Sequence, residues 1–100
     1  MNEELLNLAL AITQQFGPER AKPREERLKK ANPDIASTEA ALLFEKCDEI
    51  ERIAYQLAEK VRDKEITMEQ FSKKLHESYP ELNEARLSKT VSQAMYFSLK

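Results

Sequence analysis

Residues 37–65 read STEAALLFEKCDEIERIAYQLAEKVRDKE, and this stretch decides the fold. Its apolar residues recur every three or four positions, a spacing that places them along one side of a helix. These residues, here called the seam, are Leu43, Cys47, Ile50, Ala54, Leu57 and Val61. We therefore predict one long helix from Ser37 to about Lys64, with the seam as the surface against which the other helices pack.

The residues on either side of the seam predict how the long helix packs and which side it exposes. Leu42, Phe44 and Ile53 flank the seam and are expected to broaden the buried face. On the outward face, Asp48 and Arg52 are four residues apart, which is the spacing of a favourable ion pair within a helix. The long helix is therefore expected to pack against two neighbours and to expose a charged side.

The composition of the 100 residues favours an all-α fold. Only one residue is a glycine, and the Asn-Gly and Asp-Gly pairs that are typical of tight hairpins do not occur. The common residues are instead good helix formers such as Ala, Leu, Glu and Lys. We predict a single helical domain over residues 1–100. It is an antiparallel four-helix bundle around the long helix, or a five-helix bundle if a short basic segment also becomes helical.

Capping residues place the other helices. Asn2 and Asn83 are suitable N-caps, and Thr67 with Gln70 three residues later forms a capping box. We therefore predict helices over residues 2–16, 68–78 and from 84 towards the end of the sequence. The apolar stripes that they are expected to bury are Leu5, Ala9, Ile12 and Phe16 in the first, Met68, Phe71 and Leu75 in the second, and Leu87, Val91, Ala94, Met95 and Leu99 in the third. The Gly17-Pro18 pair is expected to end the first of them.

Residues 17–34 differ from the rest of the chain and are interpreted as a basic, proline-punctuated surface arm. Six basic and three acidic residues lie between Glu19 and Pro33, and Leu28 is the only large apolar residue there. A short helix could begin at Pro23 and run to Ala31, but it would have almost nothing to bury.

The basic residues of this arm are the first candidate binding site. They are Arg20, Lys22, Arg24, Arg27, Lys29 and Lys30. Three interpretations stay open: a solvated connection, a docking site for an acidic protein, or a set of phosphate contacts for nucleic acid. The interleaved glutamates and the absence of an aromatic residue for base stacking favour the first interpretation and disfavour the third.

A surplus of apolar helix surface provides the second candidate site. A four-helix monomer does not easily hide the apolar surface of residues 2–16, of the flanks of the long helix and of residues 95–99, which include Met95, Tyr96 and Phe97. A well-filled core would explain this surplus without a partner. We favour the alternative of a homodimer, or of a groove for a helix of another protein.

Several kinds of chemistry are disfavoured by the residues that the sequence lacks. His76 and Cys47 are the only histidine and cysteine, whereas a zinc site usually needs three or four such ligands. Cys47 lies on the seam and is expected to be buried as a small apolar residue, whereas His76 is expected at the surface. A single glycine cannot supply a phosphate-binding loop, and no Gly-x-Ser-x-Gly motif occurs. We therefore predict a protein that is not an enzyme and that holds no metal or cofactor.

The same features suggest a cellular setting. No apolar run is long enough to span a membrane, and the acidic start Met1-Asn2-Glu3-Glu4 is unlike a signal peptide. A lone cysteine agrees with a reducing cytoplasm, and a net charge of −2 does not favour anionic membranes or nucleic acid. We expect a cytoplasmic protein–protein interaction module, a regulator or inhibitor of the antitoxin or immunity kind. The alternative is a nucleic-acid-associated protein that uses residues 20–30.

Overall fold

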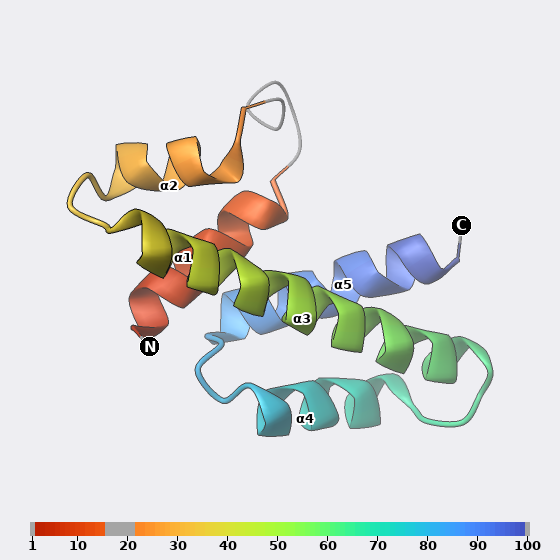
Figure 1. The fold of residues 1–100 in the computed structure, drawn as a ribbon. Coiled ribbons are helices and arrows are strands. Elements are labelled where there is room, and N and C mark those ends of the chain that lie inside the picture. Colours follow the sequence, from red (N-terminus) through yellow and green to blue (C-terminus); the bar gives the residue numbers. More distant parts are fainter. Residues whose placement is uncertain (1, 16–21, 100) are drawn as a thin grey trace. The chain divides into compact units, whose positions relative to one another are not determined.

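The computed structural model describes residues 2–15 and 22–99, and these residues form five α-helices and no strand (Figure 1). The helices are α1 (Glu3–Thr13), α2 (Arg24–Ala31), α3 (Ser37–Arg62), α4 (Met68–Ser78) and α5 (Glu84–Ser98). The predicted all-α class is confirmed. The short basic segment does form a helix, so the five-helix version of the prediction is the correct one.

The internal contacts of the chain divide it into two units, Met1–Asp48 and Glu49–Lys100. The long helix α3 belongs to both, because its residues 37–48 lie in the first unit and its residues 49–62 in the second. The prediction that residues 1–100 form a single domain depends on how these two units associate, and it stays a prediction.

In the first unit, α1 packs against α2. The Asn2 side chain caps α1 as predicted, because its Oδ1 accepts a hydrogen bond from the Leu5 backbone N–H at 3.2 Å. The helix ends at Thr13, earlier than predicted, and the expected stop at residues 16–18 lies outside the described residues. Leu6 and Leu10 are fully buried, whereas the predicted stripe residue Leu5 is half-buried.

The arm also differs from its prediction. Leu28 of α2 is fully buried, so the expectation that this helix has almost nothing to bury is wrong at that residue. The contact of α2 with α1 explains the burial, because a helix with one apolar residue can still place that residue against a neighbour.

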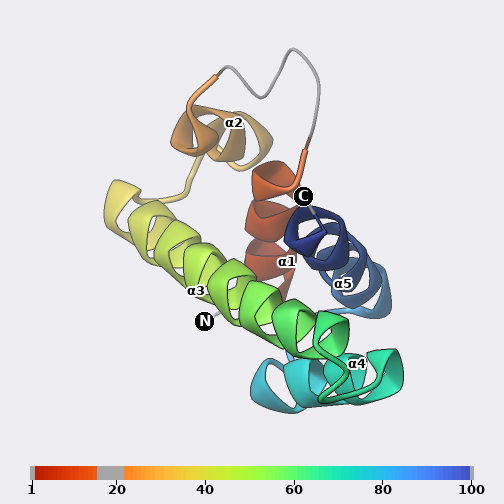
Figure 2. The same cartoon turned by 90° about the vertical axis from the view of Figure 1, so that its right-hand side faces the viewer.

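In the second unit, consecutive helices run in alternating directions, and α4 lies next to the C-terminal part of α3 in both views (Figures 1 and 2). The predicted capping box begins α4: the Gln70 N–H donates to Thr67 Oγ1 at 3.1 Å, and the Thr67 N–H donates to Gln70 Oε1 at 2.8 Å. Asn83 caps α5 in the same way. Phe71 and Leu75 of α4 are fully buried, but Met68, which was also expected inside, is 45% exposed.

The seam of α3 is confirmed over most of its length. Leu43, Cys47, Ile50 and Ala54 are buried, but Leu57 and Val61 are half-buried and Ala58 replaces them on the buried side. The flanking residues also divide into two kinds: Phe44 is buried, whereas Leu42 is 58% exposed and does not broaden the buried face.

Candidate functional site

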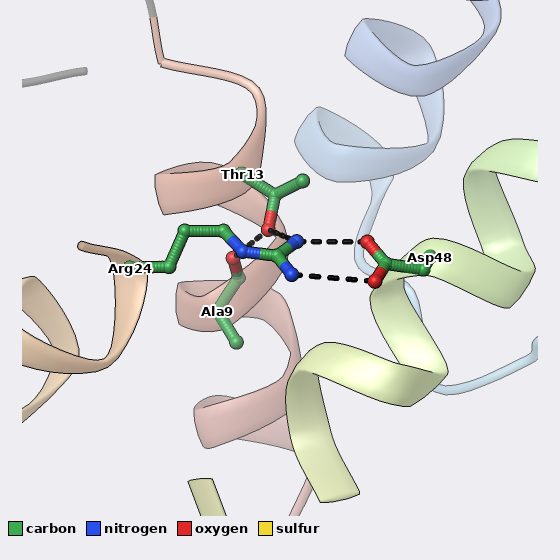
Figure 3. A network of polar contacts seen from close by, with 4 residues as sticks. All are labelled: Ala9, Thr13, Arg24 and Asp48. Carbon is green, nitrogen blue, oxygen red and sulfur yellow. Dashed lines mark hydrogen bonds and ion pairs between the residues drawn. The ribbon is translucent and has the colours of Figure 1, made fainter. Parts of the chain in front are cut away.

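Arg24 of α2 is the centre of a polar network in the first unit, here called the Arg24 clamp (Figure 3). Its two terminal nitrogens donate to the two carboxylate oxygens of Asp48, with Nη1–Oδ1 at 2.8 Å and Nη2–Oδ2 at 3.2 Å. Nη1 also lies 3.4 Å from Thr13 Oγ1, which in turn donates to the Ala9 carbonyl at 2.9 Å. The guanidinium carbon lies 4.7 Å from the centroid of the Phe44 ring.

The Arg24 clamp ties three helices together, because its residues come from α1, α2 and the N-terminal part of α3. A paired, planar contact between arginine and a carboxylate fixes both the distance and the orientation of the two groups. Stacking on Phe44 adds a cation–π contact from the face of the ring. Arg24 was predicted as a partner-binding residue, and in the structure it binds the chain itself.

Two further basic residues of the arm also contact their own chain. Arg27 Nη1 donates to Gln15 Oε1 at 3.1 Å, and Lys29 Nζ donates to Ser37 Oγ at 2.8 Å. Lys22 and Lys30 are exposed, and Arg20 lies outside the described residues. Three basic side chains of α2, those of Arg24, Arg27 and Lys29, therefore each donate a hydrogen bond to a different part of the same chain. Nucleic-acid binding by this segment stays a prediction.

The C-terminal end of α5 carries the second predicted site. Tyr96 is 57% exposed, Phe97 is 37% exposed, and Leu99 is 68% exposed. The two rings pack edge to face, with centroids 5.4 Å apart and planes at 71°. Tyr96, Phe97 and Leu99 are here called the α5 aromatic surface, and Met95 beside them is half-buried.

The buried residues of α5 differ in kind from the large apolar residues at its end. Its buried residues are mostly small or polar, namely Thr90, Val91, Gln93, Ala94 and Ser98. The Thr90 hydroxyl donates to the Arg86 carbonyl at 2.7 Å, and the Ser98 hydroxyl donates to the Met95 carbonyl at 2.8 Å. These bonds avoid the cost of burying an unsatisfied hydroxyl. The predicted apolar stripe of this helix is therefore wrong for Leu99, which is exposed.

Arg62 positions the end of α5 within the second unit. Its Nη1 donates to the Ser98 carbonyl, one of the last carbonyls of the helix, where a positive charge is favourable. Arg62 also lies within 3.6 Å of a Glu59 carboxylate oxygen and 3.8 Å of an Asp63 carboxylate oxygen. The end of α3 therefore holds the backbone beneath the α5 aromatic surface, and both acids compensate the charge of Arg62.

Tyr79 and Glu49 make a second polar link in the same unit. The phenol of Tyr79, a residue only 4% exposed, donates to Glu49 Oε2 at 3.0 Å. Burial, together with the hydrogen bond and the negative charge of Glu49, raises the pKa of Tyr79 to about 12. The bond joins the end of α4 to α3, which gives it a structural role.

The remaining candidate residues do not form a recognisable site. Cys47 is fully buried and His76 is exposed, as the sequence predicts for both. Among residues 2–15 and 22–99, no three His, Cys, Asp or Glu side chains are grouped so that they could hold a metal ion. The helices within the same ranges also include none with the length and apolar character needed to cross a membrane.

The comparisons with known proteins add no relative: no family model, no curated protein and no solved structure matches this chain. The residues that sequence reasoning missed are Asp48 and Thr13, which hold Arg24. Asp48 was paired with Arg52 on helix spacing, and no local pattern links it to a residue 24 positions away.

Proposed function

We propose that this chain is a small helical protein–protein interaction module, without catalytic activity, that binds through the α5 aromatic surface. The observation that carries the proposal is the exposure of Tyr96 and Phe97, whose rings pack edge to face, together with that of Leu99 at the same helix end. Tyrosine and phenylalanine are enriched at protein interfaces, because each provides a large rigid contact area with few rotatable bonds.

The size of the surface agrees with this function. From their exposed fractions, the three side chains present an apolar area on the order of 300 Å². This is in the range of the largest apolar patch on a typical monomer, which is often functional. A standard interface buries about 800 Å² on each partner, so this surface has the size of an apolar centre that a polar rim would surround.

We propose a second copy of the chain as the partner. In a two-fold symmetric dimer, the same surface is used on both subunits, so the edge-to-face rings of one copy would meet those of the other. Electrostatic repulsion would be weak, since the net charge is only −2 and Arg62 is compensated by Glu59 and Asp63. The lone buried Cys47 supports the cytoplasm as the compartment.

A regulator or inhibitor of the antitoxin or immunity kind is the role that we propose for such a module. It would act by covering a surface of its target with the α5 aromatic surface, so target binding and formation of the homodimer would exclude each other. A binding function needs only a shaped apolar surface with a polar rim, and the α5 aromatic surface provides the centre of one.

The test is sedimentation velocity from about 1 μM to about 1 mM protein, a range that brackets weak to moderate dimers. We expect a concentration-dependent dimer that Tyr96→Ala weakens by about 10-fold or more, the loss expected for an interface hot spot. Tyr55→Ala is the matched control, because Tyr55 is 40% exposed but lies on α3. This substitution should leave the dissociation constant of the dimer unchanged. A monomer at every concentration, or an equal effect of the two variants, would overturn the proposal.

A further inference from the structure

We infer that α2 is a strap that opens from the first unit as one piece when the Arg24 clamp is released. The inference is independent of the α5 aromatic surface. Its basis is the way in which α2 is attached. Leu28 is its one fully buried side chain, and its other described attachments are polar contacts made by Arg24, Arg27 and Lys29.

The helix has little stability of its own. It contains eight residues, which is too short for an isolated helix in water. Pro23 occupies its N-cap position and makes no side-chain cap bond, whereas α1, α4 and α5 each have one. Without its tertiary contacts α2 would therefore melt, and opening and local unfolding are the same event.

The Arg24 clamp is the attachment most sensitive to conditions. The Arg24 side chain is 34% exposed and the Asp48 side chain is 62% exposed, so water and salt reach the pair. Salt screens exposed charge pairs much more than buried ones. The strap should consequently open more often as ionic strength rises.

Opening would uncover apolar surface that the closed form hides. The Phe44 ring is only 4% exposed and lies under the Arg24 guanidinium, and Leu28 is fully buried. Release of Arg24 would expose both side chains and would free the Asp48 carboxylate at their edge. The strap therefore controls access to an apolar face on the N-terminal part of α3.

Amide hydrogen exchange on the complete chain tests the inference. The reporter amides are those of residues 27–32, including the Arg27 N–H bonded to the Pro23 carbonyl and the Asn32 N–H bonded to the Leu28 carbonyl. We expect Asp48→Asn to accelerate their exchange by about 5- to 30-fold, the factor that corresponds to losing a partly exposed paired contact. The amides of residues 43–47 should change much less, because α3 does not open with the strap.

Glu45→Gln is the matched control. It removes the same charge from an exposed residue of α3 three positions away, and Glu45 is not one of the residues that form the Arg24 clamp. Equal acceleration by Glu45→Gln and Asp48→Asn would overturn the inference. So would exchange of residues 27–32 at the rate of residues 43–47, since α2 would then open only with the whole unit.

A salt series on the unaltered protein provides a second measurement that does not depend on a variant folding correctly. Raising the salt from about 50 mM to about 500 mM should accelerate exchange in residues 27–32 selectively, because the Debye length shortens over this range. A uniform response across α1, α2 and α3 would contradict the strap.

Discussion

Lys64 has a backbone conformation that suits glycine better than lysine. Its φ is 64°, the left-handed region, and it directly follows the last turn of α3. The Glu65 N–H donates to the Lys60 carbonyl at 2.8 Å, and the Lys64 N–H donates to the Val61 carbonyl at 3.0 Å. This is the Schellman pattern of a helix end, in which the left-handed position is usually glycine.

We therefore expect Lys64→Gly to raise the free energy of unfolding by about 0.5–1 kcal/mol, because relief of the strained φ exceeds the added freedom of the unfolded chain. Lys60→Gly, one turn earlier and in helical conformation, should lower it by about the same amount. Urea unfolding of both variants measures the difference. Destabilisation by both substitutions would show that the left-handed residue carries no strain.

Tyr79 makes stability depend on alkaline pH. Its pKa is raised from 10.0 to about 12 in the folded chain, chiefly by burial and then by Glu49, so folding favours the protonated phenol. The stabilisation is fully present below pH 10 and is lost as the pH rises through about 12.

Chemical unfolding between pH 10 and pH 12 measures this effect. We expect Tyr79→Phe to lose less stability across that interval than the unaltered protein, because phenylalanine has no proton to release. Tyr55→Phe, at a more exposed tyrosine of α3, controls for the removal of a hydroxyl elsewhere. Parallel pH curves for Tyr79→Phe and the unaltered protein would contradict the assignment.

At the scale of the element, α3 shows how far a periodic pattern can predict burial. The pattern predicts that Leu57→Ala costs as much as any core truncation, about 2–5 kcal/mol. In the structure Leu43 is 1% exposed and Leu57 is half-buried, so the two positions are no longer equivalent. We expect Leu43→Ala to cost about 2–5 kcal/mol and Leu57→Ala clearly less, as measured by urea unfolding. Equal losses of stability in the two variants would show that Leu57 is as deeply buried as Leu43, as the spacing of the seam predicts.

The starts of the helices were predictable because they depend on chemistry within a few residues. The caps at Asn2 and Asn83 and the Thr67–Gln70 capping box form as the sequence predicts. Which apolar residue is finally covered depends instead on distant neighbours. Met68 and Leu42 satisfy the helical spacing and are nevertheless exposed, since spacing alone does not say where a neighbouring helix ends.

At the scale of the whole molecule, the two candidate sites differ in how much the sequence reveals. Tyr96 and Phe97 of the α5 aromatic surface were found because they fall outside the predicted apolar stripe of their helix, whereas Leu99 was placed on that stripe. The Arg24 clamp was not found, because Arg24 and Asp48 are 24 residues apart and the local pattern offered Arg52 instead. A contact between helices leaves no short-range pattern that one sequence can show.

The two proposals also predict different responses of the whole molecule to salt, a small one for the dimer and a larger one for α2. A dimer formed through the α5 aromatic surface relies on apolar contact, so its dissociation constant should change by less than about 3-fold between about 50 mM and about 500 mM salt. Exchange in α2 should accelerate over the same range. Sedimentation and hydrogen exchange on one set of samples measure both, and a dimer that dissociates with salt would indicate a charged interface.

The burial of Cys47 has a practical consequence. It is the single cysteine of the sequence and is fully buried on the seam of α3. A thiol reacts with a disulfide reagent only when its sulfur reaches solvent as the thiolate. The rate of labelling in the unaltered protein therefore reports how often this part of the interior is uncovered, and no fluorophore or isotope has to be introduced. Cys47 is therefore an intrinsic probe of local opening in the unaltered protein.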